Sequence, residues 1–317
     1  MQIHIDKRYQ DFTTIFEATT GSYLYGTALP ESDVDTRGVF IPSEKYFLGF
    51  HNRIEQIEEN KQDIVHYDIR KFMALCLDCN PNIIELLFIP NNFTQIKTPE
   101  WDEIIAHKSL FLSKKARYTF TGYAISQLHR IKQHRNWLLN PIKEQPKRSN
   151  FGLPENKTLV TKDQLNAYSE LAINYDKNIV EDYKLDINTL DVLQREKAYL
   201  NANKQWQQYL EWQKNRNPKR AELEAKSGYD CKHAMHCYRL IEEGKELLLT
   251  GNIEFPRPNA KILLDIRNGK YSYDELMTLI GNIDAQFDEY YEKSALPHSP
   301  NHEEADKLCI SLVKRKI

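Results

Sequence analysis

A segment near the N-terminus, Gly21 to Gly38, constrains this chain more than any other. It opens with a Gly-Ser turn and closes with two aspartates, Asp33 and Asp35, which lead straight into the apolar residues Val39 to Ile41. Such an apolar run predicts a buried strand. Alternate side chains of a strand lie on one face, so we expect Asp33 and Asp35 to point the same way.

Both ends of this segment suit phosphate chemistry. The backbone N–H groups and the hydroxyl of Gly21 and Ser22 can bind a triphosphate, as anion-binding turns do. Two neighbouring carboxylates repel each other unless a divalent cation lies between them. Each half of the pattern also occurs in ordinary turns. The two halves together, followed by a buried strand, favour a catalytic site.

Composition places the chain among globular proteins without a membrane span. Hydrophobic residues make up 41% and charged residues 28%, and no apolar run approaches the length of a transmembrane helix. The N-terminus has no signal-peptide core, so we expect a cytoplasmic protein. Five cysteines are scattered along the chain, in a pattern that favours neither a disulfide framework nor a structural zinc site.

The pattern of the chain changes near residue 100. Strands are expected before this point, at 15–18, 33–41 and 63–69, with a weaker candidate at 53–59. Afterwards the apolar spacing is helical. Helices are expected at 110–139, 165–172, 190–214, 229–249, 262–268, 272–294 and 306–317.

Two stretches of the second half carry clustered charge. Residues 111–150 hold many lysines and arginines but a single acid, Glu144, together with Tyr118, Tyr123 and Trp137. Cations neutralise backbone phosphates and aromatic rings stack on bases, so this stretch predicts contact with a polyanion. The basic residues that we assign to nucleic-acid binding are Lys114, Lys115, Arg117, Arg130 and Arg135. The alternative is a solvated helix face.

The second stretch lies on the helix expected at 229–249. At the angular spacing of an α-helix, Lys232, His236, Arg239 and Glu243 form one narrow stripe, and the opposite side is apolar. The spacing predicts a helix that buries one face and presents Lys-His-Arg on the other. By itself this arrangement is equally typical of a solvated helix face.

Several of these motifs together resemble one family. Gly-Ser followed by Asp-x-Asp is similar to the signature of the polymerase-β-like nucleotidyltransferase superfamily. Within it, residues 21–42 resemble the RNA repair pathway DNA polymerase beta family, as do "NPNIIELLF" at 80–88 and "CKHAMHCYRL" at 231–240. The resemblance covers roughly 18–90 and 229–276, whereas 140–225 resembles nothing that we can place.

This resemblance implies a third carboxylate and a set of nucleotide ligands. In the superfamily the third carboxylate follows the Asp-x-Asp strand at the head of an apolar run, which favours Asp63. Asp68 is the alternative, although it is also suited to cap the helix that follows. The resemblance further makes a group of residues on the later helix candidates for binding the triphosphate or the acceptor. They are Lys232, His233, His236 and Arg239.

From the residues and the resemblance we expect an α+β protein. A mixed-sheet nucleotidyltransferase domain would occupy residues 1–100 and a mainly helical domain 101–317. Asp33, Asp35 and Asp63 would hold two Mg²⁺ ions, with Mn²⁺ as the alternative ion. Gly21 and Ser22 would bind the β- and γ-phosphates of an NTP, with added charge from Arg37 or Lys232.

The acceptor divides the hypotheses. An RNA end, in tRNA or in a cleaved RNA, is favoured by the basic stretch and by the family name. A second hypothesis is nucleotidylation of a protein or a small molecule. A third is a module that binds RNA or nucleotide without catalysis. The sequence leaves the oligomeric state open.

Overall fold

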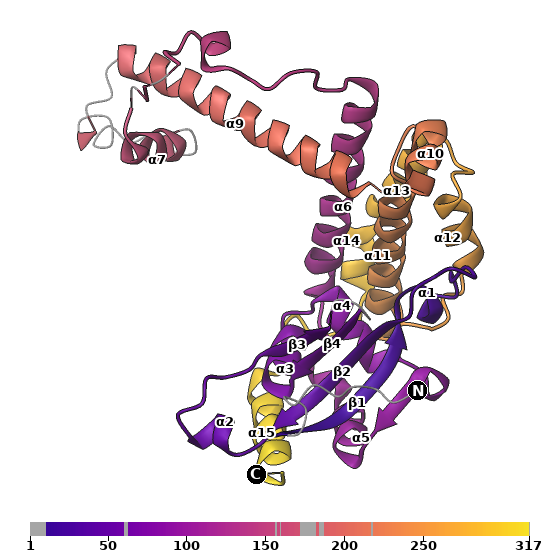
Figure 1. Ribbon diagram of the computed structural model, residues 1–317. Coiled ribbons are helices and arrows are strands. Elements are labelled where there is room, and N and C mark those ends of the chain that lie inside the picture. Colours follow the sequence, from indigo (N-terminus) through magenta and orange to yellow (C-terminus); the bar gives the residue numbers. More distant parts are fainter. Residues whose placement is uncertain are drawn as a thin grey trace. The chain divides into compact units, whose positions relative to one another are not determined.

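The computed structural model describes residues 11–59, 63–155, 157–158, 160–171, 182–183, 187–216 and 218–316. The chain divides into two compact units. The first comprises residues 1–133 and 226–317, and the second comprises residues 134–225. Figure 1 shows both, and each is described by itself below. The sheet lies in the first unit and helices dominate the rest, so the expected α+β fold is confirmed.

The sheet has five strands in the order β3-β4-β2-β1-β5. β2 and β4 pair in parallel, and the other neighbours are antiparallel. The strand bounds are Phe12–Thr20 for β1, Asp35–Pro42 for β2, Gln56–Glu59 for β3, Ile64–Asp68 for β4 and Thr94–Lys97 for β5. The sheet is therefore mixed, as expected.

The edge strand β5 was not expected from the sequence. Its residues, Thr94 to Lys97, include a single apolar side chain, and three of the four residues are exposed. An edge strand needs only one paired side, and β5 obtains it from β1. A short polar strand of this kind leaves almost no periodic signal.

Gly38 in the centre of the sheet allows a close cross-strand pair. It is flanked in register by Glu17 on β1 and by His66 on β4. A Cβ atom at Gly38 would lie 2.5 Å from the His66 ring and 2.8 Å from the Phe16 carbonyl oxygen. Because that atom is absent, Glu17 and His66 meet at 3.0 Å between carboxylate oxygen and ring nitrogen.

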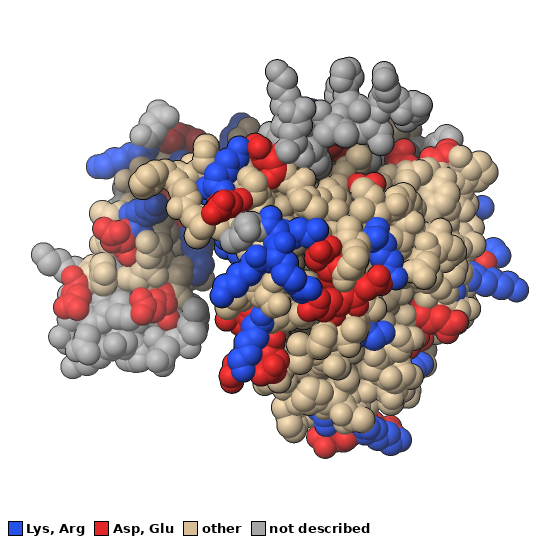
Figure 2. Space-filling view, turned by 90° about the horizontal axis from the view of Figure 1, so that it is seen from below, with Lys and Arg blue, Asp and Glu red and all other residues tan. Residues whose placement is uncertain are grey.

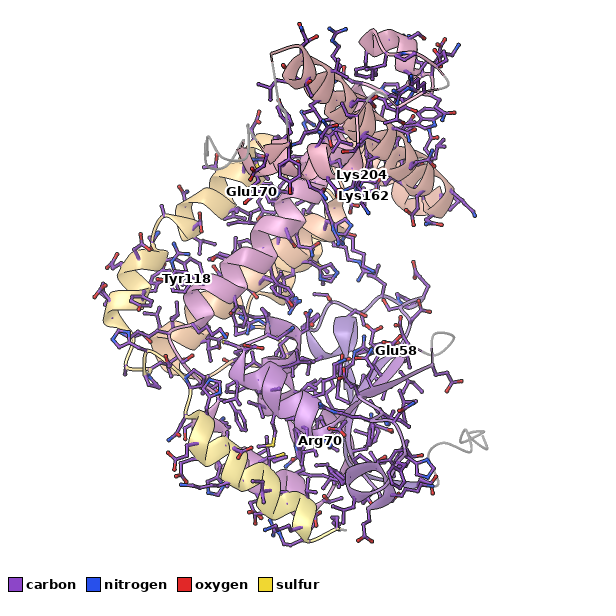
Figure 3. The ribbon with its side chains drawn as sticks, turned by 90° about the vertical axis from the view of Figure 1, so that its left-hand side faces the viewer. Glu58, Arg70, Tyr118, Lys162, Glu170 and Lys204 are labelled. Carbon is purple, nitrogen blue, oxygen red and sulfur yellow. The ribbon has the colours of Figure 1, made fainter. Side chains whose placement is uncertain are left out.

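Helices that come after β4 and β5, together with the C-terminal helix, cover the sheet. α3 (Ile69–Leu77), α4 (Pro81–Ile84), η2 (Glu85–Phe88) and α5 (Pro99–Ala106) follow its strands directly. Trp101 of α5 stacks on Phe16 at 3.9 Å between ring centres and also contacts Phe72 of α3. The C-terminal helix α15 (His302–Lys314) lies beside α3 (Figures 1 and 3). The shorter α2 (Lys45–Leu48), η3 (Asn91–Phe93) and η4 (Lys108–Leu110) occupy connections.

Two long helices pack against each other within the first unit, and the first of them continues past residue 133 into the second unit. They are α6 (Ala116–Leu139) and α11 (Cys231–Thr250). A Cβ atom at Gly244 would lie 2.7 Å from Phe120 and 3.3 Å from Phe287, so the missing side chain allows α6 and α14 to approach α11. Cys237 also contacts the Ala124 carbonyl. Phe120 precedes Ala124 on α6, whereas its partner Gly244 follows Cys237 on α11. The two helices therefore run antiparallel.

The remaining helices of the first unit pack around α11. They are α12 (Ala260–Arg267), α13 (Tyr273–Asp284) and α14 (Phe287–Lys293). The single helix expected at 272–294 is wrong, because α13 ends at Asp284 and α14 begins at Phe287. α13 begins with a capping box, in which Ser272 and Glu275 satisfy each other's backbone N–H groups.

The second unit is built on the long helix α9 (Ile187–Asn215). α7 (Lys162–Leu171) packs on it through an apolar cluster of Val160, Ala167 and Leu193. Trp137 is buried among Tyr209 and Trp212. Arg148 of η5 (Arg148–Phe151) pairs with the buried Glu196 at 2.9 Å. Most of α10 (Pro218–Ser227) also belongs to this unit.

Among the described residues, no helix has both the length and the apolar character that a membrane span requires.

Candidate active site

The Gly-Ser turn begins where β1 ends. Gly21 has a φ of +63°, a left-handed conformation that glycine adopts without steric cost. A Cβ atom there would lie 1.8 Å from Oδ2 of Asp35, so a side chain is excluded by contact as well as by conformation. The Ser22 carbonyl accepts a hydrogen bond from the Thr27 N–H at 2.8 Å, which closes the turn. Asp35 therefore lies directly against the backbone of the turn.

Asp35 and Asp63 are neighbours across β2 and β4. The parallel register pairs Thr36 with Ile64, and each aspartate immediately precedes its member of that pair. The Thr36 N–H donates to the Asp63 carbonyl at 3.1 Å. Asp63 has a φ of 52°, a left-handed conformation that is uncommon for a residue other than glycine. It lies in a turn just before β4, whereas we expected it on the strand itself.

The electrostatics of Asp35 reflect this neighbour. Burial raises the pKa of Asp35 above its ordinary value, and the negative charge of Asp63 raises it further. The positive charges of Arg37 and Lys232 lower the pKa of Asp35 and offset part of this effect. The two carboxylates thus form a close acidic pair that is short of positive charge.

Arg37 supports the pair from the same strand as Asp35. Its Nη1 donates to the carbonyl oxygens of Thr36 at 2.8 Å and of Asp63 at 2.7 Å. These bonds hold the turn before β4 against the start of β2. The guanidinium is only partly buried, so it also contributes charge to the site.

Asp33 differs from the expectation for the Asp-x-Asp motif. β2 begins at Asp35, so Asp33 precedes the strand, and the alternation of strand side chains does not set its direction. Its side chain is exposed, in a loop that follows the turn at Ser32. The expected strand over 33–41 is therefore wrong at its first two residues. The reason is that pairing with β1 ends at Thr20, whose partner is Asp35.

Asp68, the alternative third carboxylate, is the N-cap of α3. Its side chain accepts hydrogen bonds from the backbone N–H groups of Arg70 at 2.7 Å and Lys71 at 3.4 Å. The Arg70 guanidinium also binds its carboxylate at 2.7 Å, and Arg53 lies 3.8 Å away. Asp68 is fully buried and lies at the opposite end of β4 from Asp63. Its bonding capacity is occupied by the fold.

The first turns of α11 supply positive and neutral polar groups. Asp230 caps the helix by accepting the His233 N–H at 3.0 Å. The His233 ring bonds the Gln127 side chain on α6 at 2.7 Å. Burial, followed by the charges of Arg239 and Lys232, lowers the pKa of His236 to about 3. The His236 imidazole is therefore neutral at pH 7.

Further along α11, the expected Lys-His-Arg face is not a solvated one. Arg239 is 3% exposed and Glu243 fully buried. Arg239 pairs with Glu85 of η2 and, at 2.7 Å, with Glu243. Tyr25, which follows the Gly-Ser turn, donates to Glu85 at 2.7 Å, and its ring lies 4.2 Å from the Arg239 guanidinium. The prediction of a solvated helix face was wrong at Arg239, because η2 covers this residue.

This buried network joins the turn to α11. A buried charge is tolerated only when it is paired. Here Glu85 and Glu243 both pair with Arg239. Glu243 also lies 3.8 Å from Arg257. The prediction that Arg239 contacts nucleotide stays untested. Its present bonds make it a group that fixes Tyr25 and α11 relative to each other.

The basic stretch is less one-sided in space than in sequence. Lys115 pairs with Asp78 at 2.7 Å, and Arg117 pairs with Asp288 at 3.1 Å. Asp78 and Asp288 are distant in sequence from their partners, so the linear sequence hides these pairs. Lys114 lies over the Tyr291 ring and Arg130 is exposed, whereas Arg135 belongs to the second unit. On the face drawn in Figure 2, Lys and Arg side chains also lie among Asp and Glu side chains.

The aromatic residues of this stretch differ in their surroundings. Trp137 is 5% exposed and packs inside the second unit, so it is not available for stacking. Tyr123 is 37% exposed and accepts a hydrogen bond from Asn80 at 2.8 Å. Tyr118 is 65% exposed on α6 and is labelled in Figure 3. Of the three rings, Tyr118 presents the largest share of its surface.

Comparison with known proteins agrees with the resemblance drawn from the sequence. Residues 2–143 match the model of the RNA repair pathway DNA polymerase beta family. The match includes the Gly-Ser turn, Asp33, Asp35 and Asp63, and the resemblance to this family is confirmed there. Cys231 to Leu240 lies outside the matched residues, so its resemblance stays a prediction.

A curated relative extends over most of the chain. It is an uncharacterized 38.9 kDa protein in the nrdC-mobD intergenic region of Enterobacteria phage T4. The two are 24% identical over 85% of this chain and 87% of the phage protein. No solved structure matches this chain.

The family implies nucleotide chemistry with divalent metal ions, and the carboxylate pair suits such an ion. Mg²⁺ binds through oxygen ligands, commonly one or two carboxylates together with substrate phosphates. Asp35 and Asp63 supply carboxylates whose mutual repulsion a cation would relieve. The backbone of Gly21 lies against Asp35, which would place bound phosphates beside the same ion. Asp35 and Asp63 therefore fit a divalent metal ion.

Two residues of the site were missed by sequence reasoning. Tyr25 joins the turn to α11 through its hydrogen bond to Glu85, a residue that the sequence marks for testing within "NPNIIELLF". Arg267 of α12 donates to the Thr27 carbonyl at 2.8 Å, and its charge also lowers the pKa of His236. Tyr25 and Arg267 lie within the stretches that resemble the family, 18–90 and 229–276, and this was the one available signal.

Proposed function

We propose that this protein is a metal-dependent nucleotidyltransferase that moves a nucleoside monophosphate from an NTP to the end of an RNA, with release of pyrophosphate. The observation that carries the proposal is the position of Asp35, which lies against Gly21 of the turn and beside Asp63. A triphosphate bound to that turn would lie beside two carboxylates that need a cation. The matched family supports the same chemistry.

Each residue of the site has a role in this reaction. Asp35 and Asp63 would hold Mg²⁺, and Asp33 would complete the set from the loop before β2. Bound ions of this kind activate the attacking hydroxyl and neutralise the leaving phosphates. Gly21 and Ser22 would bind the β- and γ-phosphates through backbone N–H groups and a hydroxyl.

Positive and neutral groups would complete the nucleotide site. The positive charge of Lys232 lowers the pKa of Asp35, and its ammonium group would pair with phosphates held beside the carboxylates. Arg37 adds charge from β2 while bracing Asp63. His236 is neutral at pH 7 and can exchange hydrogen bonds with a phosphate or a hydroxyl without a charge of its own.

RNA is the acceptor that the observations favour. Lys114, Arg130 and Lys132 lie on or beside α6, whose residues 116–139 include no Asp or Glu. The family description also names an RNA repair pathway.

A labelling experiment tests both the donor and the acceptor. The protein is incubated with each α-labelled NTP, Mg²⁺, and total cellular RNA together with total protein. We expect label in RNA that ribonuclease removes. Label confined to protein or to small molecules would replace RNA by another acceptor. No label with any NTP would contradict the transferase, and it would favour a module that binds without catalysis.

A further inference from the structure

Helix α6 has an inner face that is fully engaged in packing. Phe120 and Ala124 contact α11 at Gly244 and Cys237, and Gln127 bonds His233. Ile131 continues the same side of the helix and is fully buried. These residues recur every three or four positions, so they define one side of α6.

The opposite side of α6 is exposed over the same turns. It consists of Tyr118, Gly122, Ile125 and His129, which recur at the same spacing and which we call the outer face of α6. Tyr118 is 65% and Ile125 is 45% exposed. Single exposed apolar residues are ordinary. Here an aromatic ring and a branched side chain flank a glycine on one helix face.

Gly122 is costly where it stands. Glycine within a helix destabilises it by about 1 kcal/mol relative to alanine. A Cβ atom at Gly122 would meet nothing within 4 Å, so no neighbour among the described residues requires its absence. A glycine at such a position leaves the helix backbone open to close approach by a ligand.

The charge around the outer face selects the kind of ligand. Residues 116–139 contain no Asp or Glu, and α6 carries the exposed Arg130 and Lys132. Tyr118 also forms an edge contact with Tyr291 at 6.1 Å, and Lys114 lies 5.0 Å from the centre of the Tyr291 ring. Exposed rings beside lysines and arginines are the features that bind single-stranded nucleic acid, by stacking on bases and neutralising phosphates.

We propose that the outer face of α6 binds the single-stranded end of the acceptor RNA. A base stacks on Tyr118, the sugar-phosphate backbone passes over Gly122, and Arg130 and Lys132 neutralise phosphates. This inference rests on the proposed function, in which RNA is the acceptor. An unpaired strand is required because the bases of a duplex are stacked on each other and present no free ring face.

The experiment measures the affinity of the full chain for a fluorescent, unstructured oligoribonucleotide by anisotropy, without NTP or metal. Stacking of one base contributes about 1–3 kcal/mol, so Tyr118→Ala should weaken binding by about tenfold or more. Gly122→Gln should raise the melting temperature, because glutamine is the better helix former. It should also weaken RNA binding, since its side chain obstructs the backbone. A stabilised protein with lower affinity cannot be explained by misfolding.

The chain offers matched controls. A Cβ atom at Gly281 on α13 would likewise meet nothing within 4 Å, so Gly281→Gln should stabilise the protein equally without changing RNA affinity. Ile310 on α15 is 45% exposed, as is Ile125. We expect Ile125→Gln to weaken binding and Ile310→Gln to leave it unchanged.

Affinities that are unchanged by Tyr118→Ala and Gly122→Gln would overturn the proposal. So would a lower oligomeric mass of these variants with normal RNA binding, because the outer face would then be a contact between protein chains. The two proposals can also be told apart. If Tyr118→Ala loses RNA binding but the wild-type protein shows no transfer, the proposed transferase is contradicted and the RNA-binding role of the outer face is supported.

Discussion

The two ends of β4 each carry an aspartate, in opposite electrostatic surroundings. At one end, Asp68 is fully buried and accepts two backbone N–H groups and the Arg70 guanidinium. At the other end, Asp63 lies beside Asp35, and the negative charge of Asp63 raises the pKa of Asp35. The first arrangement satisfies a carboxylate within the fold. The second leaves two carboxylates in need of a cation.

From this difference we predict a structural role for Asp68 and a functional role for the Asp35–Asp63 pair. A carboxylate whose hydrogen bonds are satisfied stabilises the native state, because protonating or removing it breaks bonds already formed. Two carboxylates held together against their repulsion cost stability unless a ligand compensates. Sites of this second kind are where function is expected.

The largest effect is expected when the unsatisfied pair is broken. Asp35→Asn removes a metal ligand, and metal ions supply several kcal/mol of charge stabilisation to such reactions, so transfer should fall by about a hundredfold or more. The melting temperature should stay the same or rise, because the repulsion is also removed. Transfer of α-labelled NTP and thermal unfolding measure the two effects. Asp306→Asn, an exposed aspartate on α15, is the control and should change neither. Full activity of Asp35→Asn would refute the contrast between the two ends of β4.

A smaller effect is expected at Lys232, whose charge near Asp35 corresponds to that of Arg70 beside Asp68. A hydrogen bond to a charged group is worth about 1.5–3 kcal/mol, so Lys232→Met should lower kcat/KM for the NTP by about tenfold to a hundredfold. Lys232→Arg should keep most of the activity. Steady-state kinetics with varied NTP measure this. Equal losses in both variants would mean that the charge is not what matters.

At the Asp68 end of β4, a substitution should lower the stability of the fold rather than the transfer activity. Asp68→Ala removes a helix cap and a charge-assisted bond, so the unfolding free energy should fall by about 1–3 kcal/mol. Transfer by the folded variant should remain close to wild type. Urea denaturation measures the loss. If Asp68→Ala had normal stability but no transfer activity, Asp68 rather than Asp63 would be the functional aspartate of β4.

The smallest effect concerns pH. The folded pKa of Asp35 lies above its unfolded value of about 3.9, so the native state binds the extra proton in that window. The stability that Asp35 contributes is therefore lost as the pH rises from its unfolded pKa through its higher folded pKa. Asp35→Asn should be slightly more stable than wild type at pH 7, and the difference should vanish as pH falls towards 4. A difference that grows on acidification would contradict the raised pKa.

The fold was largely predictable because its signals are periodic. Runs such as Val39 to Ile41 and the apolar stripe of α6 indicate their elements directly. β5 was missed because it is a short, polar edge strand, which leaves almost no periodic signal. Its pairing with β1 is not visible in the local sequence. The break at Ala285 was missed because helical spacing continues across it.

The site was predictable only in part. Motif spacing pointed to Asp33 and Asp35, and resemblance added Asp63. Neither gives the register that places Asp63 beside Asp35, since strand pairing is a non-local property. The partners of Arg239 were equally hidden, because Glu85 comes from a distant segment and turns an apparent surface residue into a buried one.

Transfer assays on Asp63→Asn and Asp68→Asn, side by side and below both melting temperatures, test the central claim most directly. We expect Asp63→Asn to lose transfer while remaining folded, and Asp68→Asn to retain transfer with reduced stability. An active Asp63→Asn together with a folded but inactive Asp68→Asn would contradict the assignment of function to one end of β4 and of stability to the other.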